Sequence, residues 1–560
     1  MSAASPTGAI RAPAAHAERP APARARAGGR ARVRSGAAVA GASAAWEVLA
    51  CVTALAALAL LVCAGHIRHG GFYYDDWGVL ALGRFPPAGG LLHGLWLYYG
   101  QRPAQVLYYA AFDGLIGAHA AARLAVAAAM VVLQASLLYV LLRRVGMRIW
   151  EAFACAALCL AFPFSDSVWL WGILSLTSFA ISAALLGVIL ALRALERRGA
   201  RALLLHALSL ALFVVSILSY EVFAVAGCLA GLLYVRAVGL ARAKRRWALD
   251  VIAILATLLL ARALLPIDVA TPSRTQSLAG ALGHAGLIAA AGARTLGAAL
   301  LPLAGVGPWI GAGVLAATLL VAACMYRSPR APAELGRWLA FAAAGLLLAV
   351  AAWAVYVPAP DHYLPSAAGT VNRVNALAAI GIAVLVYSAL MLLALMLARV
   401  AGLRFAPAVA ASALAVALCG AYALRTAGDV RAWDAAAGDQ RTVLADLHAA
   451  LPRPPAQAVI FAYDAPLRVG PGVPVLNTTL DLTSAVRVSY ARPRLSAVPI
   501  AAGDLRCGAA APSSAGVPGV YGHAYVVDVR ARRAVDLRGP TQCASLIARA
   551  SFASRSAPVT

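Results

Sequence analysis

The sequence predicts an all-α polytopic membrane bundle followed by a small extracytoplasmic α+β domain at the C-terminus. Apolar residues make up 62% of the 560 residues and charged residues only 12%, whereas a soluble domain has about 45 to 50% apolar and about 25% charged residues. Apolar segments near the bilayer-crossing length of about 20 residues recur from Trp46 to Leu424. After Leu424 these segments stop.

Residues 1–44 are predicted to form a disordered basic tail on the cytoplasmic side. They are rich in Ala, Pro and Gly, and their arginines lie between Arg11 and Arg34. Few large apolar residues are present, so the segment has no means of forming a core. Either retention of the N-terminus in the cytoplasm or contact with anionic lipid explains the charge.

Residues 45–424 are predicted to form the transmembrane domain, with about eleven crossings. The first crossing is expected at about 45–65, and a long outer loop, 66–118, follows it. The others are expected at about 119–141, 149–164, 172–193, 202–219, 221–238, 247–266, 306–326, 338–357, 374–398 and 405–424.

Three apolar segments do not fit a simple crossing. Within the outer loop, 90–100 and 104–117 are short and carry aromatic residues, so we expect helices that lie along the membrane surface. If 104–117 crossed instead, the basic run 143–148 would face outwards. Segment 280–304 is long enough to span, but a charge at Arg294 costs about 2.5 to 3.5 kcal/mol near a helix centre. An interfacial or re-entrant segment is therefore expected there.

Basic residues set the predicted orientation. They cluster in the turns at 143–148, 193–201, 236–246, 327–337 and 399–404, which the positive-inside rule places in the cytoplasm. The N-terminus is then cytoplasmic, and an odd number of crossings puts the C-terminal domain on the extracytoplasmic side of the membrane. A nucleic-acid-binding protein gathers its basic residues on one face. Here they are spread over several loops, so the net charge of +25 does not indicate nucleic acid.

Residues 425–560 are predicted to form the extracytoplasmic domain. We expect a helix at about 429–451 and strands at Ala458–Tyr463 and Ala524–Val529. Cys507 and Cys543 are the two cysteines of this part. An oxidising compartment permits a disulfide between them, and the alternative is two buried thiols.

Carboxylates are concentrated at the predicted outer ends. Those at outer ends or in outer loops are Asp75, Asp76, Asp113, Asp166, Glu221, Asp268 and Asp361. Asp166 and Glu221 lie in apolar surroundings, where an ionisable group is a functional candidate. We expect these two to shape an acceptor or cation site. No cysteine and histidine cluster has the spacing of a zinc site.

Asp75 and Asp76, in the run FYYDDWG, are the predicted catalytic pair. A carboxylate that faces an acceptor hydroxyl takes its proton as the new bond forms. Neighbouring carboxylates repel, so one binds a proton more tightly or both share a cation. A divalent cation is thus possible, but two acids are few ligands for one. Successive side chains on a helix diverge by about 100°, so one residue can orient the loop instead. The alternative role for the pair is to cap a helix near Trp77.

Arg102 and Arg373 are the predicted ligands of a phosphate group. A departing lipid phosphate gains charge, and fixed arginine donors stabilise it. Arg373 begins an apolar helix, close to where a lipid phosphate would lie. The alternative for Arg373 is an interfacial arginine whose side chain only reaches towards water.

The order of these motifs resembles the GT-C superfamily of polyprenyl-phosphate-sugar-dependent glycosyltransferases, especially branches related to O-antigen glucosyltransferases and protein O-mannosyltransferases. The motifs are FYYDDWG, QRP, FPFSDSVWLWG, LSYEVF and HYLPSAAGTVNRVN, within about 45–400. The resemblance implies an inverting hexosyl- or pentosyltransferase with a polyprenyl-phosphate-linked sugar donor and a glycan, lipid or protein acceptor. It carries the catalytic base over to Asp75 or Asp76 and the lipid-phosphate contact to Arg373.

Two other functions fit the same sequence. A transporter or flippase of a lipid-linked envelope precursor would also need a helical bundle with polar groups. Transporters often show repeated halves and interrupted midplane helices, and neither is evident in this sequence. A non-catalytic envelope assembly protein would use residues 425–560 to bind a partner and the bundle as an anchor.

Overall fold

The computed structural model describes residues 30–265, 277–302, 306–328, 333–359, 362–366, 368–400, 406–470, 472–501 and 503–548. Asp268 and Asp361 lie outside the described residues, as does 1–29 of the predicted tail. The chain divides into two compact units, Met1–Ala50 and Cys51–Thr560. The first helix, α1 (Arg30–His69), begins within the predicted tail and earlier than the predicted crossing.

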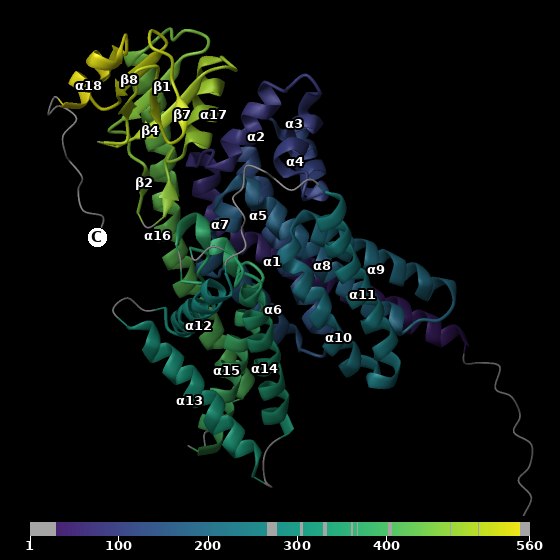
Figure 1. Ribbon diagram of the computed structural model, residues 1–560. Helices are drawn as coiled ribbons and strands as arrows, with labels where there is room; N and C mark the ends of the chain where they lie inside the picture. Colours follow the sequence, from purple (N-terminus) through teal and green to yellow (C-terminus); the bar gives the residue numbers. More distant parts are fainter. Residues whose placement is uncertain are drawn as a thin grey trace, which may run out of the picture. The chain divides into compact units, whose positions relative to one another are not determined.

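Ten helices of the described residues are long and apolar enough to cross a membrane. The spans are Ala45–His69 within α1, α5 (Ala120–Arg144), Gly172–Leu195 with α8 (Ser175–Leu195), α9 (Ala200–Ser219), Glu221–Val238 with α10 (Ala224–Val238), α11 (Leu240–Leu264), α13 (Pro308–Tyr326), α14 (Ala333–Ala354), α15 (Ala378–Val400) and α16 (Pro407–Ala450). The structure thus confirms the predicted helical membrane bundle with a small C-terminal domain (Figure 1).

The helix found in place of the predicted crossing at 149–164 is too short to span the hydrocarbon core alone. This helix, α6 (Ile149–Leu160), has 12 residues and is about 18 Å long, against a hydrocarbon core of about 30 Å. Short turns follow it: η1 (Pro163–Ser165), α7 (Ser167–Leu170) and η2 (Gly172–Leu174). Pro163 has no backbone N–H to continue the helix. The chain after α6 is therefore irregular at the level where the candidate site lies.

The outer loop folds into three short helices, α2 (Asp75–Arg84), α3 (Gly90–Tyr99) and α4 (Pro103–Ile116). None of them is among the ten candidate spans. Leu97, Leu107 and Leu115 are exposed. Exposed leucines on short helices fit the expected position along a membrane surface.

In the predicted segment 280–304, the described residues form one regular helix, α12 (Leu278–Leu300), which is not among the candidate spans. Arg294 is exposed. Gly297 of α12 lies against α13, where an added Cβ would come within 1.8 Å of the Pro308 carbonyl oxygen. The close approach of the two backbones explains why a glycine stands at this position.

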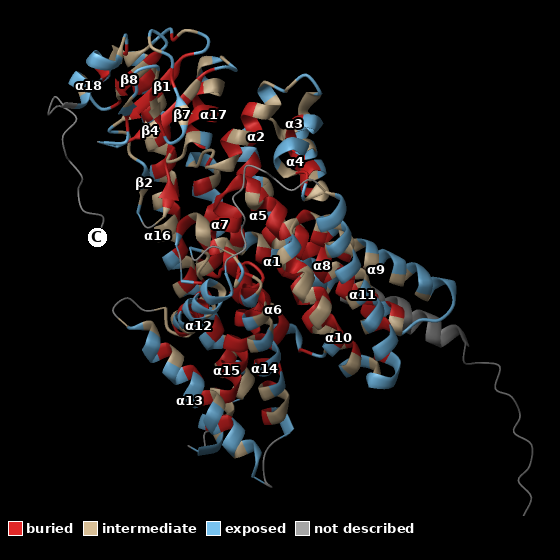
Figure 2. Cartoon of the chain, viewed as in Figure 1, coloured by how far each residue is buried: buried red, intermediate tan, exposed pale blue. Residues whose placement is uncertain are grey.

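The interior of the bundle is centred on α8 and α15, which are buried along most of their length (Figure 2). By contrast, α11 and α13 expose most of their apolar residues. A helix that is apolar all round belongs in a core or in contact with lipid. The two sets of helices therefore correspond to the protein core and the lipid-facing surface.

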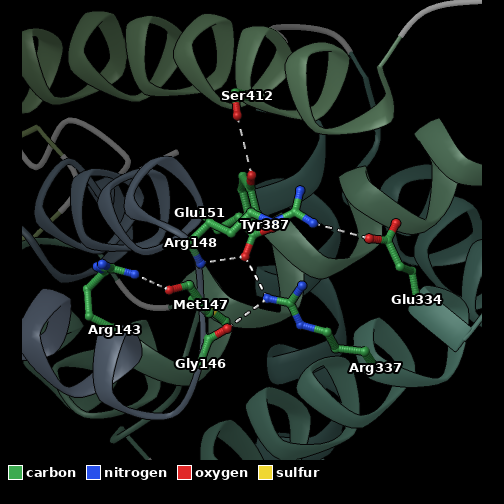
Figure 3. Close-up of polar contacts among 9 residues, drawn as sticks. All are labelled: Arg143, Gly146, Met147, Arg148, Glu151, Glu334, Arg337, Tyr387 and Ser412. Carbon is green, nitrogen blue, oxygen red and sulfur yellow. Dashed lines mark hydrogen bonds and ion pairs between the residues drawn. The ribbon is translucent and has the colours of Figure 1, made fainter.

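Polar contacts join helices at the arginine-rich end of the bundle (Figure 3). The buried Glu151 carboxylate accepts a hydrogen bond from the Arg148 backbone N–H at 2.8 Å, which caps α6. It also pairs with Arg337 of α14 at 2.7 Å. Arg337 donates to the Gly146 carbonyl at 3.1 Å as well, so the turn between α5 and α6 is tied to α14.

The helix α16 continues from the bundle into the C-terminal domain. It has 44 residues and is about 66 Å long, more than twice the thickness of the hydrocarbon core. The predicted crossing at 405–424 and the predicted helix at 429–451 are therefore one element. The predicted domain boundary at 425 falls inside this helix.

A four-stranded sheet forms the core of the C-terminal domain. The strand order is β4 (Ser496–Ile500), β1 (Val459–Tyr463), β8 (Ala524–Asp528) and β9 (Arg533–Asp536), with β1 parallel to both neighbours and β9 antiparallel. The two strands predicted from the sequence, β1 and β8, are adjacent at its centre. Phe461 and Val526 pair in register and are buried.

Smaller elements complete this domain. They are β2 (Arg468–Val469), β3 (Val473–Pro474), α17 (Thr479–Tyr490), β5 (Arg506–Cys507), β6 (Pro512–Ser514), β7 (Val517–Pro518) and α18 (Pro540–Ala548). Cys507 and Cys543 form a disulfide, with their Cα atoms 5.7 Å apart. It joins β5 to α18.

Candidate active site

The acidic pair begins α2, after a residue in an unusual conformation. Tyr74 has φ 45° and ψ −113°, a region where a non-glycine residue is strained, and such strain is concentrated at functional sites. The turn places Asp75 and Asp76 in different surroundings. Asp76 is 1% exposed, whereas Asp75 is only partly buried.

Asp76 is bonded to its own loop. Its Oδ2 accepts a hydrogen bond from the Tyr73 backbone N–H at 3.1 Å. Burial raises the pKa of Asp76 to about 7, and the charge of Arg123 opposes this rise. Asp76 therefore ties the start of α2 to Tyr73. It is not the helix cap considered from the sequence, because the N-cap residue is Tyr74 and no side chain of the described residues caps α2.

Asp75 lies on the open side of the turn. No hydrogen bond to its carboxylate is found within the described parts of the chain. Burial raises the pKa of Asp75, and the positive charge of Arg373 opposes this. Burial is the main cause of the raised pKa values of Tyr99 and Tyr109, and the negative charge of Asp75 raises both further. Asp75 thus interacts electrostatically with two tyrosines and one arginine.

Arg123, which the sequence analysis missed, supports the loop from α5. Its side chain is 1% exposed and pairs with Asp113 at 2.5 Å, and its Nε donates to the Gly117 carbonyl at 2.8 Å. The guanidinium carbon also lies 5.6 Å from the centre of the Phe72 ring. An arginine inside an apolar helix was the available signal, because such residues rarely lack a partner.

Arg373 lies in the 3-10 segment η4 (Gly369–Asn375), before α15. Its Nη1 donates to the Thr370 carbonyl at 2.8 Å. The guanidinium carbon is 5.7 Å from the ring centres of both Trp171 and Tyr363. The aromatic rings and this backbone contact hold the cation in a fixed place, so it differs from a freely reaching interfacial arginine.

Asp166 acts on the same segment from the other side. It is 1% exposed, and its Oδ1 accepts from Asn372 Nδ2 at 2.6 Å. Asn372 Oδ1 in turn accepts from the Ser167 backbone N–H at 3.2 Å. Burial and then the charge of Asp429 on α16 raise the pKa of Asp166 well above its ordinary value. These contacts indicate that Asp166 positions η4, the segment that carries Arg373.

Asn375 adds a second set of contacts to η4. Its Nδ2 donates to the Phe164 and Pro365 carbonyls, each at 2.7 Å. Its Oδ1 accepts from Trp353 Nε1 at 2.8 Å. Asn375 is fully buried. Side-chain hydrogen bonds of Asn372 and Asn375 therefore anchor η4 on both sides of Arg373.

Arg102 and Glu221, for which the sequence suggested separate ligands, pair with each other. Arg102 Nε and Nη2 contact the two Glu221 carboxylate oxygens, both at 2.6 Å. The Arg102 guanidinium carbon also lies 4.6 Å from the Tyr220 ring centre. The pair joins the start of α4 to the 3-10 turn η3 (Glu221–Phe223). Each charge is largely neutralised, which leaves Arg373 as the better placed cation.

The C-terminal part of the chain contacts the first outer loop along α16. Tyr73 Oη donates to the Trp433 carbonyl at 2.9 Å, and Trp77 Nε1 donates to Gln440 Oε1 at 3.1 Å. In addition, His66 Nδ1 lies 2.6 Å from Asp434 Oδ1. Helix α17 packs beside α2 (Figure 1). The residues on both sides of the acidic pair are thus held by α16.

Two glycines bring the C-terminal domain onto η4. Gly369 has φ 64° and Gly472 has φ 87°, values that favour glycine. An added Cβ at Gly369 would lie 2.2 Å from the Gly472 carbonyl oxygen. That oxygen also accepts a hydrogen bond from the Thr370 N–H at 3.4 Å. The turn between β2 and β3 therefore rests directly on the segment of Arg373.

Within the described residues, no group of three or more His, Cys, Asp or Glu side chains is arranged to hold a metal ion. The Asp76 carboxylate accepts a hydrogen bond from the Tyr73 N–H, whereas the Asp75 carboxylate interacts with the charge of Arg373.

No protein-family model matches this sequence. No curated protein matches it either. Among solved structures, the chain is similar to ArnT from Cupriavidus metallidurans bound to undecaprenyl phosphate, with a TM-score of 0.38 and 13% identity over 79% of this chain and 85% of that chain. It is also similar to ArnT from Cupriavidus metallidurans in the apo state, with a TM-score of 0.34 and 16% identity over 80% and 85% of the two chains.

Proposed function

We propose that this chain is an inverting glycosyltransferase that moves a sugar from a polyprenyl-phosphate carrier to an acceptor hydroxyl at the outer face of the bacterial inner membrane. The observation that supports the proposal is that Trp171 lies between the acidic turn and Arg373: its ring centre is 5.9 Å from that of Tyr74, the residue before Asp75, and 5.7 Å from the Arg373 guanidinium carbon. The charges of Asp75 and Arg373 interact, and aromatic side chains border the space around them. A base and an anion-binding cation in one place are what this transfer needs.

Asp75 is the proposed base. Its carboxylate accepts the proton of the acceptor hydroxyl while the hydroxyl oxygen bonds to the anomeric carbon of the sugar. The bond between that carbon and the phosphate oxygen breaks at the same time, and the carbon is inverted. A pKa raised by burial makes the carboxylate a stronger proton acceptor than a solvated one.

Arg373 is the proposed ligand of the lipid phosphate. As the bond to the sugar breaks, the phosphate takes the bonding electron pair and gains negative charge. An arginine held by the Thr370 carbonyl, Trp171 and Tyr363 meets this charge without reorganising. Arg373 also lies in η4, just before the apolar helix α15, so a lipid phosphate would reach it from the membrane surface.

The other predicted site residues receive supporting roles in this proposal. Asp76 orients the turn that presents Asp75, and Asp166 positions η4 through Asn372. Arg102 and Glu221 join α4 to η3 as a border of the site.

The decisive experiment replaces Asp75 with Asn. Cells that lack the gene would be complemented with wild type, Asp75→Asn or Asp504→Asn, and their envelope glycans compared by mass spectrometry. A general base contributes about 10²- to 10⁴-fold, so the product should fall at least about 100-fold with Asp75→Asn alone. Asp504 is an exposed carboxylate of the C-terminal domain and serves as the matched control.

The same cells separate the alternatives. Unchanged glycans with Asp75→Asn would contradict the proposed base. If purified wild-type protein in vesicles moved a labelled polyprenyl-phosphate sugar across the bilayer without transferring the sugar, the chain would be a transporter. Loss of product in the gene deletion together with normal product for Asp75→Asn would favour an assembly role.

A further inference from the structure

An apolar cavity lies inside the bundle and reaches towards its arginine-rich end. It has a volume of 160 Å³ and lies between α5, α8, α10, α14 and α15. Val145, Leu233 and Phe341 line it near that end. Leu232 and Leu347 also line it and are each 44% exposed, so the cavity is bordered by residues on the outside of the bundle.

A second cavity adjoins the first and is polar. It has a volume of 220 Å³ and shares Val145 and Leu233 with the apolar cavity. Arg144, Arg236 and Glu196 supply its charged groups. Two arginines against one carboxylate leave one positive charge in excess.

The two arginines differ in how far they are already paired. Arg144 Nη2 contacts Glu196 at 2.5 Å, but its buried Nε has no hydrogen-bond partner among the described residues. Arg236 is exposed, and its guanidinium carbon lies 5.5 Å from the Phe341 ring centre. A buried donor without a partner is costly unless a ligand or water accepts from it.

We propose that these two cavities bind one anionic membrane phospholipid from the leaflet at the arginine-rich end of the bundle. Its phosphodiester lies between Arg144 and Arg236, and one acyl chain enters the apolar cavity past Leu233. The single negative charge of the phosphodiester matches the excess positive charge. An acyl chain also fits a cavity without polar groups, where water would find no partners. Basic pockets between membrane helices bind lipid headgroups in this way.

This lipid site is separate from the proposed transfer reaction. Neither cavity is lined by Asp75, Arg102 or Arg373. Its test therefore measures lipid binding and does not depend on glycosyl transfer.

The test titrates delipidated full-length protein in detergent with phosphatidylglycerol and counts bound lipid by native mass spectrometry. Arg236→Gln should weaken binding about fivefold, since one arginine near a lipid surface contributes about that factor. Arg197→Gln is the matched control, because Arg197 is exposed at the same end and lines neither cavity. Leu233→Trp should also reduce binding, since the larger side chain fills the entrance to the apolar cavity.

Three results would overturn the proposal. Equal affinity of the Arg236→Gln and Arg197→Gln proteins would remove the role of the basic cavity. Equal binding of phosphatidylcholine would show that the negative charge is not recognised. Full competition by millimolar inorganic phosphate would indicate a free-anion site without a lipid.

Discussion

Replacing Asp76 with Asn should stabilise the protein at alkaline pH even though it disturbs the candidate site. Burial raises the pKa of Asp76 from 3.8 to about 7. Between these values the folded protein keeps a proton that the unfolded chain releases. The free energy of unfolding therefore falls as pH rises, by up to about 1.4 kcal/mol per pH unit. Over the whole shift, the loss above pH 7 is about 4 kcal/mol.

Asn does not ionise, so the unfolding free energy of Asp76→Asn does not fall with pH through this position. The Asn side-chain oxygen can still accept a hydrogen bond from the Tyr73 N–H. Thermal unfolding of wild type and Asp76→Asn in detergent, at pH 5 and pH 8, measures the effect. We expect the variant to gain stability relative to wild type as pH rises from 5 to 8. Asp504→Asn should show no such gain, because Asp504 is exposed. If Asp76→Asn were destabilised equally at both pH values, the Arg123 charge would outweigh burial and the reasoning would fail.

Three further predictions concern the supports of the site. In Gly472→Ala, the new Cβ would lie 2.7 Å from the Ala368 carbonyl oxygen, so the donor KM should rise severalfold with little change in kcat. Gly470→Ala is the control, because it has the same cost of a positive φ, about 1 kcal/mol, without that clash. Equal donor KM values in the two variants would refute the contact between the β2–β3 turn and the segment of Arg373 as a determinant of donor binding. Replacing both Cys507 and Cys543 with Ser should lower the unfolding free energy of the C-terminal domain by about 4 kcal/mol, because the disulfide closes a loop over 36 residues. Denaturant unfolding of the wild-type protein with and without reductant would check this, and coincident unfolding curves would contradict it. Arg102→Lys keeps the positive charge but loses the bidentate contact with Glu221, so the rate of sugar transfer should fall while the unfolding free energy changes by less than about 1 kcal/mol. A much larger loss of stability in thermal melts would show that the Arg102–Glu221 pair is mainly structural.

The hydrophobic pattern was sufficient to predict the bundle. A crossing is encoded locally, by about 20 consecutive apolar residues, so α8, α15 and the other long spans follow from composition alone. The strands β1 and β8 were also recognised, because each is a short apolar run in an otherwise mixed segment. The length of α6 was predicted less well, since Pro163 ends the helix inside an apolar stretch.

The contacts that organise the candidate site could not be predicted from the sequence. Asp166 and Asn372 are hydrogen-bonded across 206 positions, and no local pattern encodes such a pairing. The sequence predicts that Asp429 and Gln440 belong to a separate soluble domain, because the long apolar segments stop after Leu424. Helix α16 continues past Leu424 without a break, so its polar residues beyond the apolar part contact the first outer loop.

The unbroken course of α16 limits how this protein can be dissected. A truncation at residue 425 would sever the helix and remove Trp433, Asp434 and Gln440, on which Tyr73, His66 and Trp77 depend. Loss of activity in such a fragment would therefore report a collapsed outer loop and would not reveal what the C-terminal domain recognises. Chimeras between relatives would need to exchange that domain together with the loop that begins after α1.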